Sequence, residues 1–278
     1  MIQHKQLSLA ISPCPNDTYI FGSWILGLVS NERIKLSKVE YFDIEELNNM
    51  ASIGEIDLIK VSAAHAGSLL DRYDILDSGA ALGLDCGPLL ISKKKLEPKD
   101  IKHAHVLLPG EKTTAHFLFN AVVGQAKKKS FVHFSLIEDL LLNDEADAGV
   151  IIHENRFTYQ TRGLHLVKDL GQEWVHISGQ AIPLGLIMIK KSFTIEDKKQ
   201  VNFLIQQSIQ QAQTKPEALR QFIHCHAQEM SQTVQEQHIS LYVNPYSISM
   251  SEMGRKAVMA IIKEIYGPNS ISLTDFIY

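Results

Sequence analysis

The sequence is poor in the features that mark exported, membrane-bound or disulfide-linked proteins. Only three cysteines occur in 278 residues, and their wide spacing fits neither a disulfide framework nor a zinc motif: Cys14, Cys86 and Cys225. The first dozen residues contain no apolar core of signal-peptide length, and no run approaches the roughly twenty apolar residues that span a bilayer. These absences predict a cytoplasmic protein with no membrane partner.

An excess of charge of one sign is also absent. The 27 basic and 31 acidic residues leave a net charge of −4, which gives no global field to attract nucleic acid. There is no Gly-x-Gly-x-x-Gly fingerprint, so we expect no nicotinamide or flavin cofactor. Twelve histidines are present, but His224 and His226 would point to different faces of a helix, and no carboxylate or thiol completes a site with His103 and His105. We therefore predict no metal. No segment indicates a particular oligomeric state.

The composition is that of a globular protein, and short apolar runs alternate with helical patterns. This strand–helix–strand rhythm predicts largely parallel sheets with helices on their faces. Gly54 is suited to ending the helix that begins at Ile44. Strands are expected at 7–12, 35–43, 56–62, 105–110, 131–135 and 148–154, and helices at 18–29, 44–54, 113–126 and 136–144, with a mainly helical region at 195–267.

Two similar apolar segments, CGPLLIS (86–92) and IPLGLIMI (182–189), divide the chain. Each is a strand candidate near a proline that leads into basic residues. We interpret them as two crossover strands between two lobes of an α/β fold. Lobe one is then predicted to comprise 1–91 and 185–278, and lobe two 92–184.

His153 is the main candidate for catalysis. It directly follows an apolar run at a strand's end, just as Ser62 ends a strand in lobe one, and ligands gather at the carboxyl ends of parallel strands. An imidazole has an unperturbed pKa of about 6.5 and can act as a neutral base. The alternative is a structural histidine. Glu154 and Arg156 nearby are expected to pair with each other or with solvent.

Three further positions are candidates for ligand contacts. Thr113 and Thr114 open a helix, where unpaired amide groups suit a carboxylate, although either threonine could simply cap the helix. Lys60 and Ser62 share one face of their strand and either bind a ligand or are buried against a loop. The stiff loop Ser12–Thr18 contains two prolines, and Asn16 or Asp17 is suited to cap the helix after it.

Several segments resemble the 1,4-dihydroxy-6-naphthoate synthases, which serve the futalosine route to menaquinone. The resemblance covers essentially the whole chain. The segments are SPCPNDTYIF (12–21), IDLIKVS (56–62), LPGEKTTAHFLF (108–119), GVIIHENRFTY (149–159) and LYVNPYS (241–247).

The resemblance implies a two-lobed fold like the type II periplasmic binding proteins and a cofactor-independent carbon–carbon lyase. Its small carboxylate substrate would be cyclic dehypoxanthine futalosine, cleaved to 1,4-dihydroxy-6-naphthoate and dihydroxyacetone. His153 would be the proton acceptor. Substrate contacts would come from the segment Lys60, Val61 and Ser62, from Thr113 and Thr114, and from Asp17. Thr113 and Thr114 would hold either the carboxylate or a hydroxyl group.

Two rival functions remain open at this stage. One is chorismate dehydratase, a relative with the same fold, against which the HENRF segment and the PCPND opening argue. The other is a solute-binding protein that captures a carboxylate unchanged, and a poised base and the lack of an export signal count against it.

Overall fold

The computed structural model describes residues 4–84, 86–228 and 231–278. The chain forms two compact units: lobe one contains the chain up to Gly83 and from Pro183 onward, and lobe two is Leu84–Ile182. The first boundary precedes the predicted one at residue 92, because strand β6 (Leu89–Ser92) pairs with two strands of lobe two. Among the described helices, none is long and apolar enough to cross a membrane.

Lobe one is built on a mixed sheet with the strand order β12-β4-β11-β3-β1-β2, and β5 also pairs with β11. β11 runs antiparallel to both of its neighbours in this order, whereas β1 is parallel to β2 and β3. The strands are β1 (Lys5–Ile11), β2 (Ile34–Tyr41), β3 (Leu58–Ser62), β4 (Tyr73–Leu76), β5 (Ala81–Gly83), β11 (Ile182–Lys190) and β12 (Phe276–Ile277).

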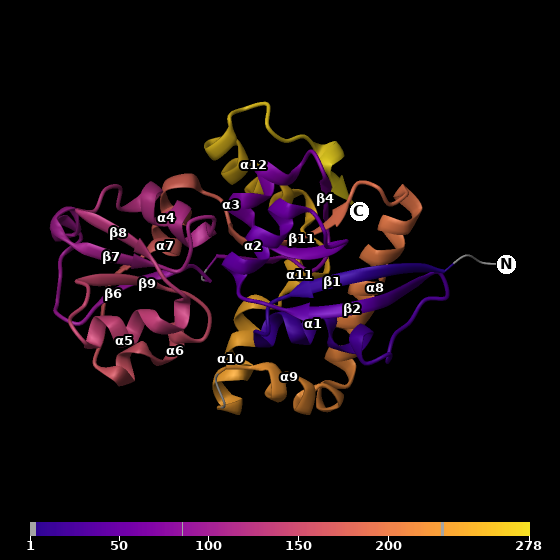
Figure 1. The fold of residues 1–278 in the computed structure, drawn as a ribbon, viewed down its shortest axis with the longest axis horizontal. Helices are drawn as coiled ribbons and strands as arrows, with labels where there is room; N and C mark the ends of the chain where they lie inside the picture. The colour runs from indigo at the N-terminus through magenta and orange to yellow at the C-terminus, as the bar shows by residue number, and fades with distance from the viewer. Residues whose placement is uncertain (1–3, 85, 229–230) are drawn as a thin grey trace. The chain divides into compact units, whose positions relative to one another are not determined.

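Helices cover both faces of this sheet (Figure 1). The core on one face joins alternate residues of β1 to α1 and α8, and Leu9, Ile20 and Ile205 within it are fully buried. Complete burial of such side chains contributes about 1.5–3 kcal/mol each. The helices are α1 (Pro15–Ile25), α2 (Ile44–Ile53), α3 (Ala63–Ala66), α8 (Ile195–Thr214), α9 (Arg220–His226), α10 (Gln232–Tyr242), α11 (Pro245–Ile248) and α12 (Ser251–Tyr266).

Lobe two has its own sheet, in the order β10-β6-β9-β7-β8. Figure 1 shows α4 and α7 on one side of this sheet and α5 and α6 on the other. The strands are β6, β7 (His105–Leu108), β8 (Lys128–Phe131), β9 (Ala148–Ile151) and β10 (His165–Asp169), and the helices are α4 (Thr114–Val122), α5 (Ile137–Leu142), α6 (Asn155–Thr158) and α7 (Leu170–Ser178). Short 3-10 turns occupy Gly67–Leu69, Pro98–His103, Phe134–Leu136, Tyr159–Arg162, Pro216–Ala218 and Leu273–Asp275.

The local sequence signals predicted most of these elements, and one predicted strand needs correction. Gly54 ends α2 in a left-handed conformation, as expected, with φ at 86°. The strand predicted at 131–135 is wrong. β8 lies earlier because Lys128–Phe131 pair in parallel with His105–Leu108. This segment is largely exposed and carries two lysines, so hydrophobic patterning could not reveal it.

Asp197 at the start of α8 ties three elements of lobe one together. Its carboxylate accepts hydrogen bonds from Thr194 Oγ1 at 2.7 Å and Arg33 Nε at 2.6 Å, and Lys5 Nζ lies 3.1 Å away. Burial alone would raise the pKa of Asp197, but these hydrogen bonds outweigh it and lower the pKa below its usual value.

We expect Asp197→Asn to lower the free energy of unfolding at neutral pH. A depressed folded-state pKa contributes stability that is present above the unfolded pKa of about 3.9 and is lost as the pH falls through the folded value. The difference between variant and native protein should therefore shrink below about pH 4. Urea unfolding at several pH values measures this, and a difference that stayed constant down to pH 2 would contradict the assignment.

Candidate functional site

The first candidate group lies at the start of α1 in lobe one. Pro15 is the first helical residue and Cys14 the N-cap residue, so the helix begins earlier than the expected Thr18, and neither Asn16 nor Asp17 caps it. Asp17 instead accepts hydrogen bonds from Ser12 Oγ at 2.8 Å and Asn16 Nδ2 at 2.9 Å. The PCPN turn thus directs the carboxylate into the lobe rather than toward its own helix.

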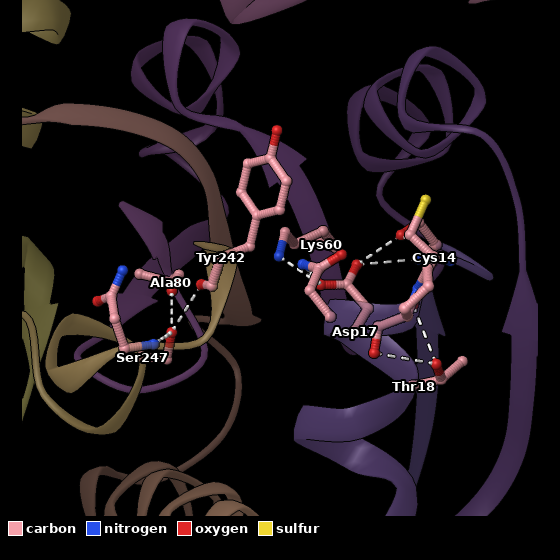
Figure 2. Close-up of polar contacts among 11 residues, drawn as sticks. Cys14, Asp17, Thr18, Lys60, Ala80, Tyr242 and Ser247 are labelled. Atoms are coloured by element: carbon pink, nitrogen blue, oxygen red, sulfur yellow. Dashed lines mark hydrogen bonds and ion pairs between the residues drawn. The ribbon is translucent and has the colours of Figure 1, made fainter. Parts of the chain in front are cut away.

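Lys60 on β3 completes this group. Its Nζ atom lies 2.6 Å from Asp17 Oδ1, and Figure 2 shows the two side chains pointing toward each other. The side chains of Lys60 and Asp17 are only 5% and 1% exposed. Removing both charges from water costs several kcal/mol per ion before their attraction offsets it. A pair this costly is weak evidence for stability and is more informative as a candidate binding site.

Gly185 makes room for the lysine. β11 runs antiparallel to β3, with Gly185 opposite Ser62. A Cβ atom at Gly185 would come within 2.5 Å of Lys60 Cε. The Lys60 stem therefore crosses the space that a side chain at position 185 would fill, and this places the ammonium group beside Asp17.

Ser62 is held by Asn48, a residue that was not predicted from the sequence. Asn48 Oδ1 accepts from the Ser62 amide at 2.8 Å, and Asn48 Nδ2 donates to Ser62 Oγ at 3.0 Å. Asn48 is fully buried on α2, four residues after Ile44 on the helix's apolar face, and a polar residue on that face was the available signal. Val61 is also fully buried, and strand alternation turns its side chain away from the face of Lys60 and Ser62.

The LYVNPYS segment has a structural role next to the first crossover. Ser247 Oγ donates to the carbonyl oxygen of Ala80 at 2.9 Å, as Figure 2 shows, and Asn244 Nδ2 donates to that of Leu82 at 2.8 Å. The amide of Gly79 donates in turn to the Ser247 carbonyl oxygen. These bonds fix residues 79–82, from which the chain leaves lobe one.

In lobe two, Thr113 is the N-cap residue of α4. Its hydroxyl oxygen accepts from the His116 amide at 3.2 Å and donates its proton to the Gly110 carbonyl oxygen at 2.9 Å. The hydroxyl group thus has one lone pair left and no proton to give a ligand. Thr114, the first helical residue, is 3% exposed. The first-turn amide groups of a helix lack intrahelical acceptors and suit an anion.

His153 lies just beyond β9, whose strand ends at Ile151. Its backbone is left-handed, with φ at 58°, which is uncommon for a residue other than glycine. The imidazole ring makes an edge contact with Phe134, with ring centroids 4.8 Å apart. Left-handed residues persist where the surrounding structure fixes them, and they cluster at functional sites.

The expected pairing of Arg156 with Glu154 or with solvent is wrong. Arg156 Nη2 donates to Asp169 Oδ2 at 3.1 Å, and Nη1 donates to the Gly87 carbonyl oxygen. Both partners are distant in sequence, so a local pattern could not predict them.

We expect His153→Gly to be more stable than His153→Ala by about 1 kcal/mol, because alanine in the left-handed region costs about 1–2 kcal/mol and glycine does not. Both variants lose the ring, so the comparison isolates the backbone. At positions with ordinary backbone angles, alanine is the more stabilising of the two residues because it restricts the unfolded chain. Chemical denaturation of the two proteins measures the difference, and a more stable His153→Ala would rule out backbone strain at this position.

The family model described as menaquinone biosynthesis matches residues 7–266. A 1,4-dihydroxy-6-naphthoate synthase of Streptomyces coelicolor is 36% identical over 261 residues, which cover 92% of this chain and 91% of the relative. Another, of Thermus thermophilus, is 36% identical over 260 residues, with 94% of each chain covered.

Solved structures agree on the fold. A crystal structure of an Archaeoglobus fulgidus protein matches with a TM-score of 0.86 and 27% identity, covering 94% of this chain and 98% of that one. The alkanesulfonate-binding protein of Xanthomonas axonopodis matches with a TM-score of 0.72 and 14% identity, covering 99% of each chain. A periplasmic aliphatic sulphonate-binding protein of Escherichia coli matches with a TM-score of 0.68 and 11% identity, covering 99% of this chain and 92% of that one.

The predicted periplasmic-binding-protein-like fold is thereby confirmed. The resemblance found in the sequence is confirmed as well, since both curated relatives have this name and cover nearly the whole chain. This chain belongs to the menaquinone biosynthesis family.

Proposed function

We propose that the chain is a 1,4-dihydroxy-6-naphthoate synthase: a cofactor-independent carbon–carbon lyase of the cytoplasm that converts cyclic dehypoxanthine futalosine to 1,4-dihydroxy-6-naphthoate and dihydroxyacetone. The two curated relatives and the family match support this assignment. The observation that carries the mechanism is His153, an imidazole on a left-handed turn at the carboxyl end of β9.

In the proposed reaction, His153 removes a proton from a carbon next to a carbonyl group of the substrate. The electron pair of that C–H bond moves into the ring system, and a carbon–carbon bond breaks to release the three-carbon fragment. The fragment leaves with the electron pair of the broken bond and takes up the proton that the imidazolium returns. The step therefore balances in atoms and electrons. Aromatisation of the remaining bicycle drives the sequence forward.

Groups for substrate binding are proposed at two places, the start of α4 and the end of β3. The N-terminus of α4 would bind the carboxylate, because the Thr113 hydroxyl has already donated its proton to Gly110. The His116 amide is not among the donors, since it donates to Thr113 Oγ1. Thr113 could still accept a hydrogen bond from a substrate hydroxyl. In lobe one, the Lys60 ammonium and the Ser62 hydroxyl are the candidate donors to substrate oxygens, and Asp17 holds the ammonium in place.

The proposed function is tested by incubating the purified protein with cyclic dehypoxanthine futalosine and, separately, with chorismate. We expect 1,4-dihydroxy-6-naphthoate and dihydroxyacetone from the first and unchanged chorismate from the second, by mass spectrometry. Recovery of the futalosine derivative unaltered from its complex with the protein would indicate a binding protein. Turnover of chorismate alone would indicate a dehydratase.

We expect His153→Asn to lower kcat by about 10²–10⁴-fold, the usual contribution of a positioned general base. Asparagine tolerates the left-handed conformation, so the backbone should remain in place. Circular dichroism and thermal unfolding would confirm that the variant folds. Turnover within threefold of the native rate in a folded variant would exclude His153 as the base.

A matched pair of variants tests the role of Lys60 in binding. Lys198 is the control, since its side chain is 8% exposed and its Nζ atom lies 2.6 Å from Asp74 in the same lobe. We expect both Lys60→Gln and Lys198→Gln to lower the melting temperature. Only Lys60→Gln should raise KM, by about tenfold or more, the loss of one charge-assisted hydrogen bond. Equal effects on KM would assign Lys60 a purely structural role.

A further inference from the structure

The side chain of Arg156 makes two hydrogen bonds and has no role in the reaction proposed above. It lies on α6, three residues after His153, and its side chain is 16% exposed. One arm of the guanidinium group, Nη2, donates to Asp169 Oδ2 at 3.1 Å, and the other, Nη1, donates to the carbonyl oxygen of Gly87. The planar group thus joins two segments of lobe two that are far from it in sequence.

The two segments that Arg156 joins also contact each other directly. Asp169 is the N-cap residue of α7, and its Oδ1 atom accepts from the amides of Gly171 and Gln172, both at 3.0 Å. A Cβ atom at Gly87 would come within 2.2 Å of Gly171 Cα, so the backbones touch where the chain has just entered lobe two. The Leu170 amide also donates to the Pro88 carbonyl oxygen at 3.0 Å.

The backbone connects Arg156 directly to the His153 turn. The Arg156 amide donates to the His153 carbonyl oxygen at 3.4 Å, and the Phe157 amide donates to that of Glu154 at 2.9 Å. The far end of the same segment is fixed by Arg162, whose Nη1 atom lies 2.8 Å from Glu138 Oε2. The residues after His153 are therefore anchored at both ends by arginine side chains.

We propose that Arg156 is a positioning residue for the base: by anchoring the turn to Gly87 and Asp169, it holds His153 in its left-handed conformation and fixes the direction of the imidazole ring. This inference rests on the proposed function and deepens it. A left-handed histidine needs such anchoring, because the ordinary regions of backbone space are lower in energy. A base misplaced by about 1 Å can lose about 10²-fold in rate.

The geometry explains why an arginine occupies the position. One planar guanidinium group reaches a carbonyl oxygen and a carboxylate at once, whereas a lysine ammonium acts as a point charge on a flexible stem. Lysine at position 156 should therefore keep only part of the bridge.

The test compares Arg156→Ala with Arg255→Ala in the native-length protein. Arg255 is a matched control on α12 of lobe one: its side chain is 17% exposed, and its Nη1 atom lies 2.8 Å from Asp77. We expect Arg156→Ala to lower kcat for the cyclic substrate by about tenfold to a hundredfold with KM within threefold. Arg156→Lys should lie between it and the native protein. Arg255→Ala should keep kcat within twofold at a similar loss of melting temperature.

Asp169→Asn provides a second variant should Arg156→Ala fail to fold. The asparagine side chain still caps α7, because its amide oxygen accepts the same hydrogen bonds, but the charge facing Arg156 is gone. We expect kcat to fall by about threefold to tenfold, less than in Arg156→Ala, because one charge-assisted hydrogen bond is weakened and the bond to Gly87 remains. Unchanged kcat in a folded Asp169→Asn or Arg156→Ala protein, or an equal fall in Arg255→Ala, would overturn the proposal.

A readout that needs no turnover separates this inference from the proposed function. The ring Cε1–H signal of His153 can be identified by NMR as the one missing in His153→Asn. We expect it to shift in Arg156→Ala and Asp169→Asn and to stay in place in Arg255→Ala. Native protein that failed to convert the cyclic substrate would refute the function alone, whereas an unmoved His153 signal would refute the positioning role.

Discussion

The position of the candidate base depends on one unfavourable backbone conformation, the left-handed turn at His153. The residues before it belong to β9, which pairs with β6 on one side and β7 on the other. The residues after it are tied by Arg156 and Arg162. A strained residue persists under such constraint, and the same constraint gives the imidazole a fixed direction. An acid–base group needs this fixed direction more than it needs a special sequence around it.

Lobe one contains a different costly feature, a pair of charged side chains that is buried away from water. Lys60 and Asp17 are nearly fully buried, and the hydrogen bonds from Ser12 and Asn16 occupy further lone pairs of the carboxylate. The apolar core between the sheet and helices α1 and α8 offsets the cost of that burial. The pair therefore lies among buried residues of lobe one, whose close packing limits rearrangement.

The parts of the fold that local signals specify could be predicted from the sequence. The strand predicted at 56–62 located Ser62 at the end of β3, and the capping pattern located Thr113 at the start of α4. The parts that depend on tertiary partners could not. The edge strand β8 has no apolar pattern, and the partners of Arg156 are distant in the chain. The left-handed turn at His153 contains no glycine, the residue that usually indicates such a conformation.

The missing side chain at Gly185 has a consequence for protein engineering. The stem of Lys60 passes through the space that a β-carbon at position 185 would take. The ammonium group and the glycine on the neighbouring strand are therefore one unit, although they lie more than a hundred residues apart. To transfer the Lys60–Asp17 pair to another protein of the same fold, a designer must also transfer the glycine at position 185. A larger residue there would displace the lysine side chain from the carboxylate.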